Sequence, residues 1–203
     1  MILSMIRELP LLTNTGSGQS ITTSSLQDAS VGVVGAGRIG ETVINMLKSI
    51  GAKNVYYWNR TRKREIESRW AIKYLPLEEL CRKVDVITSH VATPAGEIFS
   101  SSMIQLMKPG TILVNNGGHG LIDKEALLKR LAAGELRYAS DEASFGRSNQ
   151  DEGDLKELPI SRYYHSNSSS AFNTQPSLDA MSDQVTDFII DVLKNNDKSK
   201  AVA

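Results

Sequence analysis

The pattern of apolar and polar residues along this chain predicts β-strands that alternate with amphipathic helices. An apolar run at 31–34 leads into a glycine-rich segment at 35–40, and an apolar stripe at helical spacing continues from there to Ile50. The same patterns predict further strands at 55–58, 85–89, 111–114, 136–139 and 162–165, and helices at 77–83, 102–107, 123–133 and 175–194. Strands separated by helices predict an α/β fold, a Rossmann-type doubly wound parallel sheet that binds ligands at the carboxyl ends of its strands.

The first 25 residues lie outside this alternation. Ile2, Met5, Ile6 and Leu9 recur at helical spacing until Pro10, and the segment 13–25 is rich in Ser, Thr and Gly, as flexible linkers are. We therefore expect an N-terminal helix at 1–12, a linker at 13–25, one nucleotide-binding domain at 26–194 and a disordered tail at 195–203.

The glycine-rich segment has the spacing of a dinucleotide-binding turn, G-x-G-x-x-G, between a strand and a helix. Gly35 permits the tight turn, Gly37 lets backbone N–H groups approach a pyrophosphate, and Gly40 lets helix and strand pack closely. Because a helix N-terminus favours anions, we expect Arg38 and Ile39 to contact the cofactor together with the three glycines.

A basic run follows the second strand, beginning Asn59-Arg60-Thr61. In the dinucleotide fingerprint, an acidic residue near this place binds the adenosine ribose and repels a 2′-phosphate. Here Asn59 takes that place, and the guanidinium of Arg60 suits a phosphate dianion, so the sequence predicts NADP in preference to NAD. The alternative interpretation is that the run is an ordinary solvated surface.

Composition narrows the remaining function classes. The chain has 23 basic and 23 acidic residues and a net charge of zero, so we expect neither nucleic acid nor a membrane as a partner. Its one cysteine, Cys81, excludes an intrachain disulfide framework and is typical of a cytoplasmic protein. The N-terminal apolar segment is interrupted by charges and lacks a basic start, so we expect no signal peptide, and we predict no metal site.

Several ordered blocks together resemble one family. They are the turn at 31–40, the segments 77–80 and 85–90, Met107-Lys108-Pro109-Gly110 with the strand that ends at Asn115, Leu121-Ile122-Asp123-Lys124-Glu125-Ala126-Leu127, and Ala171-Phe172-Asn173-Thr174. From Val31 to roughly Val192, the chain resembles the nucleotide-binding domain of the D-2-hydroxyacid dehydrogenases. This resemblance implies an NAD(P)-dependent oxidoreductase acting on the CH–OH group of small 2-hydroxy or 2-oxo acids.

The resemblance also implies cofactor contacts at the other strand ends. They are His90, Val91 and Ala92 after one strand, Asn115, Asn116 and Gly117 after the next, and Asp141 beside the nicotinamide amide. At His90 the family commonly has a histidine, for which a structural role is favoured over a catalytic one. Asn59-Arg60 resembles the NADP-using reductases of the family.

The catalytic groups of the family are replaced in this sequence. The position of its substrate-binding Arg falls on Gly118 and that of its supporting Glu on Ser144. The position of its acid/base His falls on Ser169, or on Asn167 if the segment is gapped. None of these residues holds a carboxylate or supplies a proton near neutral pH as an imidazole does. His119 is the best substitute candidate, although a histidine in such a loop is more often incidental, and His165 is a second candidate.

A separate substrate domain precedes the nucleotide-binding domain in this family, and a long helix joins them. Residues 1–12 resemble the end of that helix, so the chain is interpreted as a fragment, a truncated gene product or a stand-alone domain. We expect a homodimer, or a substrate domain supplied in trans. Two functions of different class remain, an NAD(P)-dependent oxidoreductase and a non-catalytic NAD(P)-binding protein that acts as a sensor or subunit, with a cofactor-free scaffold as a weaker third.

Overall fold

The computed structural model divides the chain into two units, Met1–Asn167 and Ser168–Ala203, which are described separately. It describes residues 1–7, 25–91, 96–117, 120–141, 155, 157–159, 161–166 and 174–195. For Asp141, His165, Ser166 and Asn195 the description covers the backbone alone.

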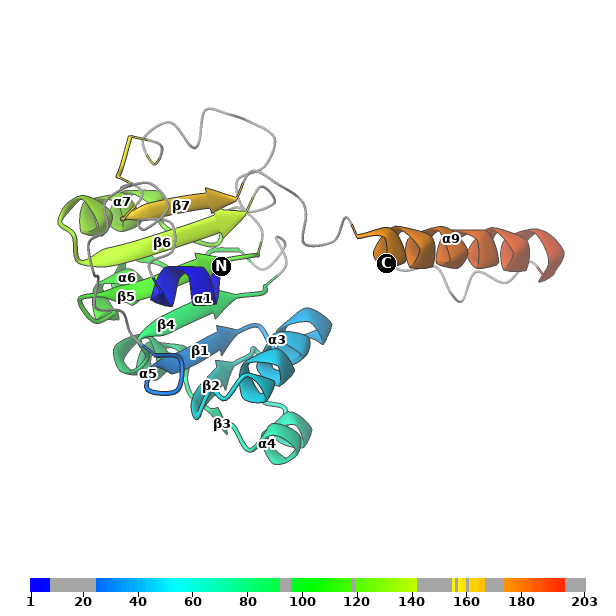
Figure 1. Ribbon diagram of the computed structural model, residues 1–203, viewed down its shortest axis with the longest axis horizontal. Coiled ribbons are helices and arrows are strands. Elements are labelled where there is room, and N and C mark those ends of the chain that lie inside the picture. Colours follow the sequence, from blue (N-terminus) through cyan, green and yellow to red (C-terminus); the bar gives the residue numbers. More distant parts are fainter. Residues whose placement is uncertain are drawn as a thin grey trace. The chain divides into compact units, whose positions relative to one another are not determined.

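Within the described residues, the first unit is built on a seven-stranded sheet in the order β3-β2-β1-β4-β5-β6-β7 (Figure 1). All neighbouring strands are parallel. The strands are β1 Ser30–Val34, β2 Asn54–Trp58, β3 Lys73–Tyr74, β4 Val86–Ser89, β5 Thr111–Asn115, β6 Leu136–Asp141 and β7 Tyr163–Ser166. The chain moves outward from β1 to β3 and then returns to β4, so the direction of winding reverses between β1 and β4. In doubly wound sheets, ligands bind at this point.

Helices cover both faces of the sheet (Figure 1). One face carries α1 Ile2–Ile6, α3 Arg38–Ser49 and α4 Arg64–Trp70, and the other carries α5 Leu77–Lys83, α6 Ser101–Leu106 and α7 Lys124–Ala132. Met5, Ile44 and Ile66 pack in the first core, whereas Leu80 and Leu131 pack in the second. Because helices bury both faces of the sheet, the inner strand β5 is buried along its whole length and has the apolar sequence expected of such a strand.

The predicted elements lie close to the observed ones, and the parallel α/β architecture is confirmed. The N-terminus of α7 is capped as expected, because the Asp123 carboxylate accepts a hydrogen bond of 3.0 Å from the Ala126 N–H. Two elements were missing from the sequence prediction, α4 and β3. Ile66 is the one buried residue of α4, and β3 has only two residues, so neither produces a periodic apolar pattern.

The described part of the second unit is the helix α9 Gln175–Asn195, predicted at 175–194. Apolar side chains along it are exposed, among them Leu178, Met181, Val185 and Ile189. The assignment of 26–194 to one domain stays a prediction. No described helix combines the length and the apolar content that a bilayer crossing requires.

Candidate dinucleotide site at the carboxyl edge

The turn between β1 and α3 contains two glycines that its own packing requires. Gly35 has a φ of +89°, and a Cβ there would lie 2.9 Å from the carbonyl oxygen of His90. A Cβ on Gly40 would lie only 1.9 Å from the carbonyl oxygen of Gly35. These two positions therefore exclude a side chain because the backbone of the turn folds back on itself and on the end of β4.

Gly37 has a different environment. Its φ of −74° and ψ of −164° suit any residue, and a Cβ there would meet no described atom within 4 Å. Gly37 is the N-cap of α3, whose first-turn N–H groups have no acceptor within the helix. The open space in front of a helix N-terminus fits a pyrophosphate, and a side chain would fill that space.

Asn59 joins this turn to the loop after β2. Its Oδ1 accepts a hydrogen bond of 3.1 Å from the Ala36 N–H, and its Nδ2 donates one of 2.8 Å to the carbonyl oxygen of Thr61. The sequence placed Asn59 where an acidic residue would bind the ribose. In the structure its side chain instead joins the glycine-rich turn to the loop after β2. Asn59 therefore contributes to a cofactor site by positioning these two loops.

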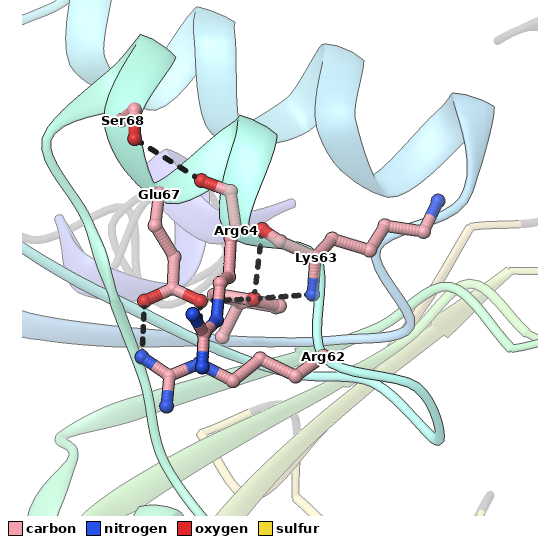
Figure 2. A network of polar contacts seen from close by, with 6 residues as sticks. Arg62, Lys63, Arg64, Glu67 and Ser68 are labelled. Atoms are coloured by element: carbon pink, nitrogen blue, oxygen red, sulfur yellow. Dashed lines mark hydrogen bonds and ion pairs between the residues drawn. The ribbon is translucent and has the colours of Figure 1, made fainter.

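The arginines of the basic run after β2 differ in their contacts. The guanidinium of Arg62 forms an ion pair of 2.7 Å with the Glu67 carboxylate (Figure 2). Arg60 is exposed and makes no hydrogen bond or ion pair with any other described residue. Arg60 is therefore available to an anionic ligand beside the glycine-rich turn, whereas Arg62 is already neutralised.

Buried polar atoms without partners gather where β4 and β5 end. Among the described residues they include Ser89 Oγ, His90 Nδ1 and Asn116 Oδ1. The register pairs Ser89 with Asn115, so these ends lie side by side. A Cβ on Gly117 would lie 2.5 Å from the carbonyl oxygen of Val91, which shows how closely the two following loops approach each other. Buried polar groups are normally satisfied, so this edge of the sheet has the donors and acceptors that a polar ligand would use.

His90 is held as a neutral imidazole. Its Nε2 lies 3.0 Å from Thr88 Oγ1, and burial lowers the pKa of His90 from its ordinary value of 6.5 to about 4. The ring is therefore uncharged at neutral pH, with no imidazolium to act as an acid, and its low pKa makes it a weak base, which favours the structural role that the sequence assigned to it over an acid/base role.

This pKa makes the stability of the protein depend on pH. The unfolded chain protonates His90 near its ordinary pKa of 6.5, whereas the folded chain resists protonation down to about 4. Stability is therefore complete above pH 6.5 and is lost as the pH falls, by about 2 kcal/mol between pH 7 and pH 5. We expect His90→Gln to lack this part of the pH dependence in urea unfolding. Parallel curves for the two proteins would contradict the assignment.

Several sequence-predicted residues lie outside the described part of the chain. They are Ala92, Gly118, His119, Ser144, Asn167 and Ser169, and of Asp141 and His165 only the backbone is described. The backbone places Asp141 at the end of β6, paired with Ser166 of β7. The catalytic assignments on these positions therefore stay predictions.

Sequence reasoning missed two residues of this edge, Ser89 and Tyr57. Ser89 is fully buried at the end of β4, and Tyr57 is fully buried in β2, where its hydroxyl accepts a hydrogen bond from the Lys63 N–H of the basic loop. A signal existed for Tyr57, because a tyrosine within a buried strand needs a hydrogen-bond partner for its hydroxyl.

Two cavities of the first unit lie away from this turn. One, of about 530 Å³, lies at the amino ends of the strands around Asp85, Lys108 and Arg137. The other, of about 500 Å³, lies beside α6 and α7. We place the candidate site at the carboxyl edge nevertheless, because the open helix N-terminus is there together with three of the four partnerless buried side-chain atoms of the described residues; the fourth, Thr111 Oγ1, lines the first cavity.

Comparison with known proteins finds similarity to one family of dehydrogenases. The family model described as D-isomer specific 2-hydroxyacid dehydrogenase, NAD binding domain, matches residues 1–152. A D-specific alpha-keto acid dehydrogenase of Enterococcus faecium is 36% identical over 141 residues, which are 68% of this chain and 42% of that protein. A glyoxylate reductase of Aeropyrum pernix is 35% identical over 117 residues, which are 57% of this chain and 35% of that protein. The matches thus span less than half the length of these two relatives.

Solved structures show the same fold. The D-lactate dehydrogenase of Aquifex aeolicus, in complex with NAD and lactic acid, superposes with a TM-score of 0.82 at 21% identity, covering 98% of this chain and 65% of that one. D-2-hydroxyisocaproate dehydrogenase superposes with a TM-score of 0.79 at 23% identity, covering 98% and 64%.

Proposed function

The chain belongs to the D-isomer specific 2-hydroxyacid dehydrogenase family, and on that premise we propose that it binds a nicotinamide dinucleotide at the carboxyl edge of its sheet. The observation that carries the proposal is the open N-terminus of α3 at Gly37. Its N–H groups would hold the pyrophosphate, because they are the unpaired donors of the helix. Ser89, His90 and Asn116 would supply polar contacts farther along the edge.

The proposed cofactor is NADP in preference to NAD. Support comes from Arg60, which is exposed and unpaired among the described residues, and from Asn59, which brings no negative charge to the ribose. A guanidinium forms charge-assisted hydrogen bonds with a phosphate dianion that a ribose hydroxyl cannot match.

The proposed reaction is the interconversion of a small 2-oxo acid and its 2-hydroxy acid. Support comes from the relatives, which include a D-specific alpha-keto acid dehydrogenase and a glyoxylate reductase. A dihydronicotinamide held at this edge would supply a hydride for the carbonyl carbon, and a residue of the protein would have to deliver a proton to the carbonyl oxygen. His119 stays the candidate for that proton, on the sequence alone.

Reduction of glyoxylate, pyruvate or hydroxypyruvate by NADPH would test the reaction. We expect NADPH consumption that requires the 2-oxo acid, and a rate about 100-fold lower in His119→Ala. An unchanged rate in His119→Ala would remove His119 as the proton donor. Binding of NADPH without turnover of any of the three acids would leave the non-catalytic alternative.

The expected homodimer, or a substrate domain supplied in trans, also stays a proposal. Its support is that three large apolar side chains of the first unit, Leu3, Ile39 and Met46, are exposed. Sedimentation of the purified chain would distinguish a monomer from a dimer.

A further inference from the structure

A buried tyrosine anchors the loop that carries Arg60. Tyr57 is fully buried in β2, and its hydroxyl accepts a hydrogen bond of 2.9 Å from the Lys63 N–H. The hydroxyl lies 2.9 Å from Glu67 Oε1 and 3.1 Å from the Lys63 carbonyl oxygen, either of which can accept its proton. Burial raises the pKa of Tyr57 to about 12, so the hydroxyl keeps that proton throughout the neutral range.

Glu67 extends this contact to Arg62. Arg62 Nε donates to Glu67 Oε1 at 2.8 Å and Nη2 donates to Oε2 at 2.7 Å, which is a bidentate pair (Figure 2). The same guanidinium lies 5.6 Å from the ring centre of Tyr74, which in turn makes an edge contact of 5.5 Å with the Tyr57 ring. We call Tyr57, Arg62, Lys63, Glu67 and Tyr74 the Tyr57 clamp.

The Tyr57 clamp holds only one end of the loop. The other end is held by Asn59, which bonds to the Ala36 N–H and to the Thr61 carbonyl oxygen. Arg60 lies between these two attachments and has an exposed side chain. The loop therefore presents one unpaired guanidinium at a backbone position fixed from both sides, beside the turn that begins at Gly35.

We propose that the Tyr57 clamp is a specificity-determining device, in which Tyr57 is a positioning residue that acts through Arg60 on the 2′-phosphate of NADP. The clamp neutralises Arg62 with Glu67 and fixes the backbone at Lys63. Of the two arginines in the loop before α4, Arg60 and Arg62, Arg60 alone therefore meets the ligand. This inference rests on the proposed preference for NADP, and it adds the reason why that preference depends on a residue in the core of the sheet.

The test compares Tyr57→Phe with Tyr56→Phe, which makes the same chemical change one position earlier in β2. Tyr56 is partly buried in the other core, on the opposite face of the sheet, and lies over Lys83. We expect Tyr57→Phe to raise the Kd for NADPH about fivefold and to leave the Kd for NADH within about twofold, because it removes one hydrogen-bonding group of the loop anchor. Tyr56→Phe should change neither Kd.

Two further variants make the test specific. Glu67→Asp keeps the net charge but shortens the carboxylate, so it should reproduce the selective loss without a change in long-range electrostatics. In an Arg60→Ala background, Tyr57→Phe should weaken NADPH binding no further, because the clamp acts through Arg60. Additive effects in this double-mutant cycle would overturn the proposed route.

The outcomes separate this inference from the proposed function. Wild-type protein that binds NADPH no more tightly than NADH would contradict the cofactor preference itself. Wild-type preference for NADPH that survives intact in both Tyr57→Phe and Glu67→Asp would overturn the clamp alone. Equal losses of NADH and NADPH binding, with a lowered melting temperature, would reduce the Tyr57 clamp to a structural element and overturn its role in specificity.

Discussion

Replacement of Gly40 by alanine is expected to destabilise the first unit by about 3 kcal/mol, near the upper end of what overpacking costs in proteins. The added Cβ would lie 1.9 Å from the carbonyl oxygen of Gly35, a backbone atom that cannot rotate away as a side chain can. In an unconstrained helix, replacement of glycine by alanine stabilises the helix by about 1 kcal/mol. A loss of stability in Gly40→Ala would therefore show that the turn and the helix pack too closely for a Cβ. Urea unfolding followed by circular dichroism measures it.

Gly37→Ala is the matched control, three residues earlier in the same turn. It should change the free energy of unfolding by less than about 1 kcal/mol, because its Cβ would meet no described atom within 4 Å. Yet it should weaken NADH and NADPH alike by about tenfold or more, since the methyl group would occupy the space proposed for the pyrophosphate. Full stability in Gly40→Ala, or unchanged cofactor binding in Gly37→Ala, would contradict this division of roles.

Replacement of Arg60 by alanine is expected to raise the Kd for NADPH by about 10- to 100-fold, which corresponds to the loss of charge-assisted hydrogen bonds to the 2′-phosphate. The Kd for NADH should stay within about twofold, because NADH has a hydroxyl at that position and offers the guanidinium no phosphate. Fluorescence titration of both cofactors gives the two constants from one preparation.

Arg82→Ala is the control for the loss of a positive charge. Arg82 is exposed in the last turn of α5, which leads into the amino end of β4 and is therefore at the opposite edge of the sheet. It should leave both dissociation constants unchanged. A selective loss of NADPH in Arg82→Ala as large as in Arg60→Ala would show that overall charge, and not a local contact, sets the preference.

The fold could be predicted because its signals are local and repeated. The apolar run at 31–34, the three glycines and the amphipathic helix identify β1 and α3 without any tertiary information. The same holds for α5, observed at the predicted bounds Leu77–Lys83. By contrast, α4 and β3 depend on contacts with β2 and α3 more than on their own periodicity, so the sequence pattern did not reveal them.

The sequence predicted where the residues of the candidate site lie, but not which contacts their side chains make. The sequence placed Asn59 and Arg60 at the carboxyl end of β2, and the structure finds them there. It did not foresee that Asn59 would bond to the Ala36 N–H or that Glu67 would neutralise Arg62. These contacts join residues 5 to 23 positions apart, and they depend on side-chain directions that only the folded backbone defines.

Isothermal titration of the purified wild-type chain with NADPH, and in parallel with NADH, tests the central claim most directly. The open N-terminus of α3 and the unpaired Arg60 predict that both cofactors bind and that NADPH binds about 10-fold or more tightly than NADH. No heat of binding for either cofactor at millimolar concentration would contradict the assignment of a dinucleotide site to the carboxyl edge of the sheet.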